Sequence, residues 1–145
     1  MNQIIQSAGS RFAGVMLTVC ALLTGAGYAI AAGTSVNLSG SQEVPPVQTS
    51  ASGTGTITVN DDKSVSGSVT TKGIKATMAH IHEAAPGQNG GVVIPLTKKG
   101  DNEWVVPPDA KLNDAQYQAY KAGNLYVNVH SDAHKPGEIR GQLKP

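Results

Sequence analysis

Residues 54–71 read TGTITVNDDKSVSGSVTT, and apolar and polar residues alternate on both sides of a polar turn. In Thr54–Asn60 the alternation has the period of two residues that is typical of a strand with one buried face. The turn at Asn60–Lys63 leads into Val65–Thr71, which has the composition of a returning strand. This segment therefore predicts an antiparallel hairpin.

The remainder of the sequence continues this pattern. Short segments rich in Val, Thr and Ile are separated by Gly, Pro, Asn and Asp, which indicates closely spaced strands. One helix is predicted at Leu112–Ala122, with an N-cap at Asn113 or Asp114. An all-β fold follows, an antiparallel β-sandwich with Greek-key connections and one short helix. The further predicted strands are Val36–Ser39, Ile74–Glu83, Val92–Leu96, Glu103–Val106, Leu125–His130 and Glu138–Leu143, with the third and fourth of these expected to pair.

The N-terminal segment has the organisation of a secretory signal peptide. Phe12–Ala32 contains no charged residue, Arg11 precedes it, and Ala29–Ala31 forms an A-x-A cleavage site. We therefore expect residues 1–31 to be a signal peptide, and residues 32–145 to form one domain of a periplasmic or secreted protein. A retained membrane anchor is the alternative, because the apolar run is long enough to span a bilayer.

The charge balance and the cysteine count exclude several classes of protein. The 145 residues include 11 Lys and Arg against 10 Asp and Glu, and loss of Arg11 with the leader would make the two counts equal. We therefore expect no nucleic-acid partner, since such proteins have a basic excess or a basic stripe, and no membrane contact after cleavage. Cys20, the only cysteine, also lies in the leader. The mature domain is thus expected to have no disulfide and no thiolate ligand.

The four histidines fall into two groups, His80 with His82 and His130 with His134. Because successive side chains of a strand point to opposite faces, His80 and His82 share one face with Met78 and are able to converge on one metal ion. His130 ends a later strand, so three imidazoles meet if the two strands are neighbours. His134, on the following loop, and Met78 are candidates for a further ligand, with water or a loop carboxylate as the alternative.

The ligand types indicate which metal to expect. The candidate set of His80, His82, His130, His134 and Met78 contains no thiolate, which suits Cu(II) or Zn(II), and a thioether also accepts Cu(I). Copper is the first expectation and zinc the second. The alternative is that the histidines are ordinary hydrogen-bonded residues of the sheet and that the methionine fills the core.

Two charged residues are predicted on one face of the last strand, Glu138 and Arg140. One expectation is an ion pair between them at the rim of the sheet. The alternative is that the pair orients a ligating histidine or an anion near the metal.

Four short motifs occur in a fixed order: Leu38–Pro46 (LSGSQEVPP), Ala79–His82 (AHIH), Tyr126–His130 (YVNVH) and Pro136–Gly141 (PGEIRG). Together they resemble the CHRD (chordin) domain family over Leu38–Leu143. The resemblance implies an exported, immunoglobulin-like β-sandwich, found alone in bacterial proteins and repeated in animal chordin. It implies no settled activity for the single-domain members.

A more distant resemblance concerns the histidines. His80, His82 and His130 are similar in kind and order to the copper ligands of copper-zinc superoxide dismutases, Greek-key β-sandwiches with an H-x-H strand and a later strand ending in V-x-H. This chain has no histidine between His82 and His130 that would bridge copper and zinc. Arg140 is similar to the arginine that guides the anionic substrate in that family.

Three functional hypotheses follow. The first is an exported protein that binds, buffers or delivers copper without catalytic turnover. The second is a redox enzyme with activity like that of superoxide dismutase, in which Arg140 attracts the anion. The third is a metal-free module in which sheet edges or the 84–91 loop bind a protein partner. A homodimer that shares one metal ion would also suit a chain with so few histidines.

Overall fold

The computed structural model of the protein describes residues 32–145. The expected signal peptide, its cleavage site and Cys20 lie outside the described residues, so those expectations stay predictions. Within the described range, no helix is both long enough and apolar enough to cross a membrane.

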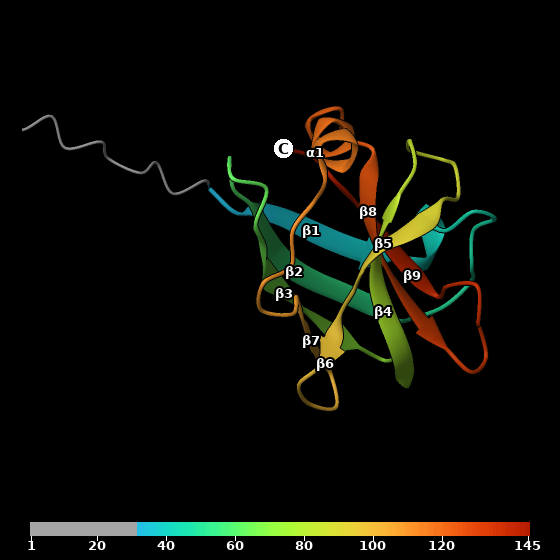
Figure 1. Ribbon diagram of the computed structural model, residues 1–145. Coiled ribbons are helices and arrows are strands. Elements are labelled where there is room, and N and C mark those ends of the chain that lie inside the picture. Colours follow the sequence, from blue (N-terminus) through green and yellow to red (C-terminus); the bar gives the residue numbers. More distant parts are fainter. Residues whose placement is uncertain (1–31) are drawn as a thin grey trace, which may run out of the picture.

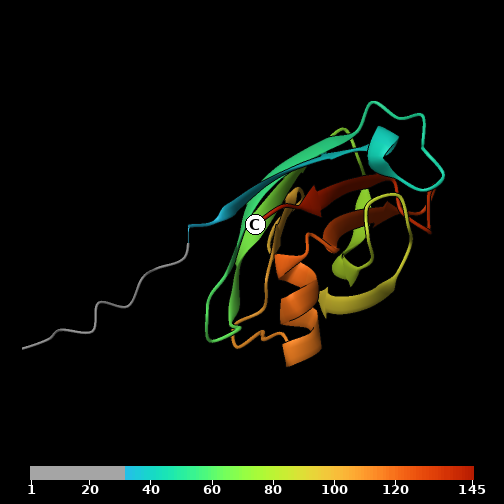
Figure 2. The ribbon, with the colours of Figure 1, turned by 90° about the horizontal axis from the view of Figure 1, so that it is seen from above.

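Nine strands in this range form one sheet in the order β5-β4-β8-β9-β1-β2-β3-β7-β6, and all neighbouring strands are antiparallel. Strands β1 and β9 pair only through Ser39 and Arg140, and the sheet bends there into two parts. These parts face each other across the core (Figures 1 and 2), which confirms the predicted all-β sandwich. The strands are β1 (Thr34–Ser39), β2 (Ser52–Val59), β3 (Val65–Lys72), β4 (Ala76–Glu83), β5 (Gly91–Pro95), β6 (Thr97–Lys98), β7 (Glu103–Val105), β8 (Leu125–Ser131) and β9 (Ile139–Leu143).

The hairpin predicted from residues 54–71 is confirmed as β2 and β3, which pair from Ser52 with Lys72 to Val59 with Val65. Its inward side chains, such as Ile57 and Val69, are fully buried. The alternating Thr and Ser residues lie on the other face, as a strand with a period of two residues requires.

The expected pairing of Val92–Leu96 with Glu103–Val106 is wrong. The short β6 pairs with β7 around the turn, whereas β5 pairs with β4. Leu96 separates β5 from β6: its side chain is buried and its amide donates to the carbonyl of Ala79 at 2.9 Å. The apolar run therefore belongs to β5 and ends at the buried Leu96, and the strand that pairs with β7 is the polar pair Thr97 and Lys98 at the other end of the sheet.

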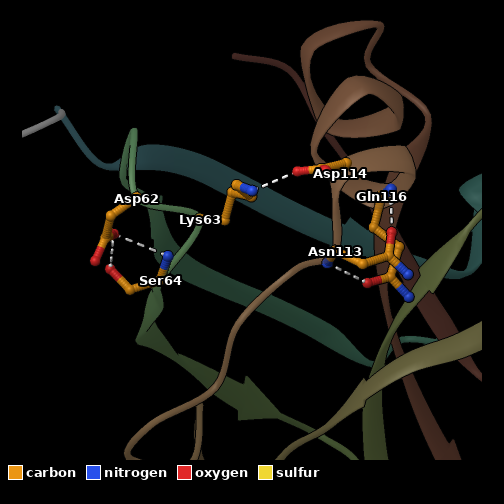
Figure 3. Close-up of polar contacts among 6 residues, drawn as sticks. All are labelled: Asp62, Lys63, Ser64, Asn113, Asp114 and Gln116. Carbon is orange, nitrogen blue, oxygen red and sulfur yellow. Dashed lines mark hydrogen bonds and ion pairs between the residues drawn. The ribbon is translucent and has the colours of Figure 1, made fainter.

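The helix α1 (Asp114–Lys121) lies at one end of the sandwich (Figure 1), within the predicted segment Leu112–Ala122 and directly after the predicted N-cap Asn113. Asn113 is its N-cap: its side-chain oxygen accepts from the amide of Gln116 at 2.8 Å, and the Gln116 side chain accepts from the Asn113 amide at 2.9 Å. An ion pair between Lys63 and Asp114 joins this end of the helix to the β2–β3 turn (Figure 3). In that turn, Asp62 accepts from the Ser64 amide at 3.0 Å.

Candidate metal centre

The two strands that carry the histidine motifs, β4 and β8, are neighbours in the sheet. Their register places Met78 opposite His130, and His82 opposite Tyr126. The intervening inward residues, such as Ala79 and Val129, are buried in the core. The expected sharing of one outward face by the histidines of both strands is therefore confirmed.

Three of these imidazoles form a compact group. His80, His82 and His130 each offer a ring nitrogen, and the three nitrogens lie within 4.8 Å of one another. The closest approach joins His80 Nδ1 to His130 Nε2 at 3.0 Å. Ring centroids are separated by 4.9 Å for His80 and His130, and by 5.4 Å for His80 and His82. One ion placed among these nitrogens would need only small movements of the rings to reach all three.

Backbone carbonyls fix the orientation of two of the rings. His82 Nδ1 lies 3.0 Å from the carbonyl oxygen of Gly90, and His130 Nδ1 lies 2.9 Å from that of Lys135. A carbonyl only accepts, so both imidazoles donate from Nδ1 and keep the lone pair on Nε2. Metal-binding histidines in proteins generally donate their second ring nitrogen to an acceptor in this way.

The lone pair on His82 Nε2 accepts no hydrogen bond within the described residues. His82 Nε2 is buried and finds no hydrogen-bond partner among the described residues. Buried polar atoms are nearly always paired, so such an atom calls for an explanation. His82 contributes a nitrogen to the group of three, so an ion shared with His80 and His130 would give its lone pair a partner, in place of the hydrogen bond between His80 Nδ1 and His130 Nε2.

The surroundings of His80 and His82 favour the neutral form of these two imidazoles. Burial lowers the pKa of His80, and the neighbouring rings of His130 and His82 lower it further. Burial also lowers the pKa of His82, with smaller contributions in the same direction from His130 and Arg140, while the bond to the Gly90 carbonyl acts in the opposite direction. Neutral imidazole is the form that coordinates a metal.

A stack of side chains supports His82 from behind. The ring of Tyr126 lies nearly parallel to that of His82, with 5.0 Å between centroids and an interplanar angle of 11°. The guanidinium carbon of Arg140 lies 3.5 Å from the centre of the Tyr126 ring on β8. The Tyr126 hydroxyl accepts from the amide of Gly90 at 3.1 Å. Gly90 is thus held by Tyr126 through its amide and by His82 through its carbonyl.

Arg140 anchors the loop that covers this face and makes no ion pair with Glu138. Its guanidinium donates to the carbonyl of Gln88 at 2.8 Å and to the side chain of Gln142 at 3.0 Å. Glu138 instead accepts from the hydroxyls of Thr49 and Ser131. The expected rim ion pair is therefore wrong. The Glu138 carboxylate is hydrogen-bonded to hydroxyl groups, and the Arg140 guanidinium stacks on an aromatic ring and donates to carbonyl oxygens.

A buried acid and amide lie beside this group. The Asn128 side chain donates to both carboxylate oxygens of Glu43 at 3.0 Å. Burial raises the pKa of Glu43, while the bond from Asn128 and the positive charge of Arg140 act against that rise. Glu43 comes from the turn after η1 (Gly40–Gln42), far from β8 in the sequence. The contact between Asn128 and Glu43 therefore joins this turn to the face of β8 that carries the histidines.

The sequence model of the CHRD domain family matches residues 34–143. The chain belongs to the CHRD domain family. The match confirms the resemblance seen in the four motifs and extends over almost all of the described residues. No curated protein and no solved structure gave a significant match.

Two of the five candidate ligands of this CHRD domain lie outside the group of three. His134 lines a cavity of about 130 Å³ with Glu43 and Gly137, and its backbone amide donates to the Ser131 hydroxyl at 3.2 Å. Met78 faces the same side of the sheet as the histidines and is 47% exposed. Their roles as ligands stay predictions.

Several residues of the site had no sequence signal of their own. The carbonyls of Gly90 and Lys135 act through the backbone, which any residue provides. Strand alternation puts Asn128 and Tyr126 on the face of His130, but their partners Glu43 and Arg140 belong to other segments of the CHRD domain. The single sequence signal for Glu43 is its place in the Leu38–Pro46 motif, which supports the family resemblance but indicates no role for the residue.

The lowered pKa values of His80 and His82 predict a pH-dependent stability. These imidazoles bind protons more weakly in the folded chain than in the unfolded chain, so unfolding takes up protons as the pH falls. The contribution of these two histidines to the free energy of unfolding should be fully present above about pH 6.5, and the free energy of unfolding should decrease below that pH. Urea unfolding of the metal-free protein at about pH 7.5 and about pH 5.5 measures this decrease.

The double variant His80→Ala/His82→Ala is the comparison for this measurement. Its free energy of unfolding should decrease less between the two pH values, because the two groups that take up the protons are gone. An equal decrease in the variant would contradict the prediction, since other groups would then account for the whole effect.

Proposed function

We propose that this CHRD domain binds a copper ion through His80, His82 and His130, and that it binds, buffers or delivers copper in the periplasm or outside the cell. The observation that carries the proposal is the group of three ring nitrogens within 4.8 Å of one another. Two of the rings are already oriented by carbonyls for coordination through Nε2. The export in the proposal rests on the expected signal peptide.

The donor set favours copper over other metals. It consists of three imidazoles, and residues 32–145 contain no cysteine. Hard cations such as Mg²⁺ and Ca²⁺ prefer oxygen ligands, whereas imidazoles suit copper, zinc and nickel. Among divalent ions copper binds nitrogen donors most strongly. Zinc is the competitor that an experiment must separate.

Binding fits the site better than redox turnover does. The dismutase hypothesis requires Arg140 to attract an anion, but this side chain is 1% exposed and engaged with Tyr126, Gln88 and Gln142. The three imidazoles come from one chain, so the proposal does not need a homodimer to complete the site.

The test is a metal titration of the purified protein, followed by thermal melting and metal analysis. A ligand that binds only the folded state raises the melting temperature. We expect Cu(II) and Cu(I) to raise it more than Zn(II) does, and the His80→Ala/His82→Ala variant to lose the shift. His134→Ala is the comparison, because it removes the histidine outside the group, and a retained shift would show that His134 is not needed as a ligand.

The outcomes separate the parts of the proposal. No shift with any metal would reject metal binding, and an unchanged shift in the double variant would place the ion elsewhere. A shift that is larger with zinc would retain the site and reject copper. Copper-loaded protein that removes superoxide much faster than free copper would restore the redox hypothesis.

A further inference from the structure

We infer that the site takes copper as Cu(I), with the thioether of Met78 as the fourth ligand beside the three imidazoles. This inference rests on the proposed function and adds to it the oxidation state of the metal. It is carried by the position of Met78, by its exposure and by the charges around the histidines.

Met78 is in the right place on the sheet. It is the residue directly opposite His130 in the pairing of β4 with β8, and it lies two residues before His80 on the same strand. Side chains opposite each other on neighbouring strands have Cβ atoms about 4.5–5.5 Å apart. Residues two apart on a strand are separated by about 7 Å. A methionine side chain has three rotatable bonds, so its thioether is able to turn toward the neighbouring imidazoles.

The irregularity in β4 lies before Met78, so Met78 keeps the regular alternation with His80 and His82, and Ala76 is the residue turned into the core. The register with β8 shifts between Ala76 and Met78. In a regular strand these two residues would share a face, but Ala76 is buried in the core and Met78 is 47% exposed. Bulges of this kind often occur beside functional sites, where they redirect a side chain.

The exposure of Met78 argues against a role in packing. Met78 and Val92 are the only large apolar side chains exposed in the described range. Val92 lies opposite His82 on β5, so both residues flank the histidine group. A thioether left in solvent contributes little to the core, and it is free to turn toward an ion.

The charges near the site favour a monovalent ion. The group of three contains no carboxylate, so nothing within it balances a second positive charge. The buried guanidinium of Arg140 lies behind His82, with the ring of Tyr126 between them, and the nearby carboxylate of Glu43 offsets its charge. The absence of a carboxylate among the ligands and the type of the ligands therefore carry the preference for Cu(I). Imidazole and thioether ligands together suit Cu(I).

The test compares Met78→Leu with the wild-type protein. Leucine keeps the size and apolarity of the side chain and removes the sulfur, and the site is exposed, so the fold should be retained. Affinity for Cu(I) is measured anaerobically against a chromophoric Cu(I) chelator, and affinity for Cu(II) against a Cu(II) chelator. Val92→Ala is the matched control, an exposed apolar residue on the other side of the histidines.

We expect Met78→Leu to weaken Cu(I) binding by about tenfold and to change Cu(II) binding by less than about threefold. The Cu(II)/Cu(I) reduction potential of the site then falls by about 59 mV for each tenfold loss of Cu(I) affinity relative to Cu(II) affinity. Val92→Ala should change neither affinity. X-ray absorption of the Cu(I)-loaded wild type should show a copper–sulfur contact that Met78→Leu lacks.

Two results would overturn the inference: an unchanged Cu(I) affinity in Met78→Leu, or an equal loss of Cu(I) and Cu(II) affinity. If His80→Ala/His82→Ala abolishes copper binding while Met78→Leu has no effect, the proposed function stands and this inference fails. If the wild-type protein binds neither Cu(I) nor Cu(II), the proposed function itself fails.

Discussion

Replacing Arg140 with alanine is expected to destabilise the fold by about 4 kcal/mol, although the residue lies on a polar face and not in the apolar core. Arg140 is the largest of the fully buried side chains. Its removal leaves a cavity against Tyr126 and deprives the Gln88 carbonyl and the Gln142 side chain of their donor. Both losses are costly, because hydrogen bonds from a charged donor and large-to-small changes at a buried position each contribute kilocalories to stability.

Urea unfolding of Arg140→Ala and of Lys121→Ala tests this expectation. Lys121 also places its cation over an aromatic ring, 4.9 Å from the centre of Tyr117, but it is exposed. Its replacement should cost less than about 1 kcal/mol, as for other exposed pairs of this kind. If Arg140→Ala costs no more than Lys121→Ala, burial of the guanidinium does not contribute to the stability of the fold.

Gly137→Ala is expected to cost about 3 kcal/mol, because the position combines an unfavourable backbone angle with a lack of space. Gly137 has φ of +144°, which side chains with a Cβ rarely adopt. An added Cβ would lie 2.4 Å from Asn128 Oδ1 and 2.8 Å from Glu43 Oε1. The methyl group would therefore separate the buried amide from the buried carboxylate.

Gly100→Ala is the matched control for this substitution. Gly100 lies in an exposed turn, and a Cβ added there would meet no atom within 4 Å. The change in the free energy of unfolding should stay within about 0.5 kcal/mol of wild type. A similarly small change for Gly137→Ala would contradict the prediction, since Asn128 and Glu43 would then move apart without lowering the free energy of unfolding.

The orientation of the candidate ligands was predictable because it depends on local geometry. Alternation along a strand sends Ala79 and Ile81 to one side and His80 and His82 to the other, whatever the strand pairs with. By the same rule, the side chain of His130 points to the other face of β8 from that of the inward Val129. Sequence alone therefore indicates which face carries the imidazoles, and the structure confirms it.

The rest of the site depends on contacts that no local rule specifies. Whether β4 and β8 are neighbours is decided by the folding of the whole sheet. The carbonyls of Gly90 and Lys135 are placed by loops, and backbone groups leave no mark in a sequence. The same limit explains the error at Val92–Leu96, where the burial of Leu96 against other segments overrides the apparent continuity of the run.

The histidine group also bears on the order of events when the chain folds. His80 and His130 are separated by 50 residues, and β5, β6, β7 and α1 lie between them. Contacts at such separations form only after a large loss of chain entropy, and they slow folding. The three imidazoles therefore come together only when β4 and β8 have paired. An ion held by them would act after folding, and it would retard the separation of the two strands without hastening their first encounter.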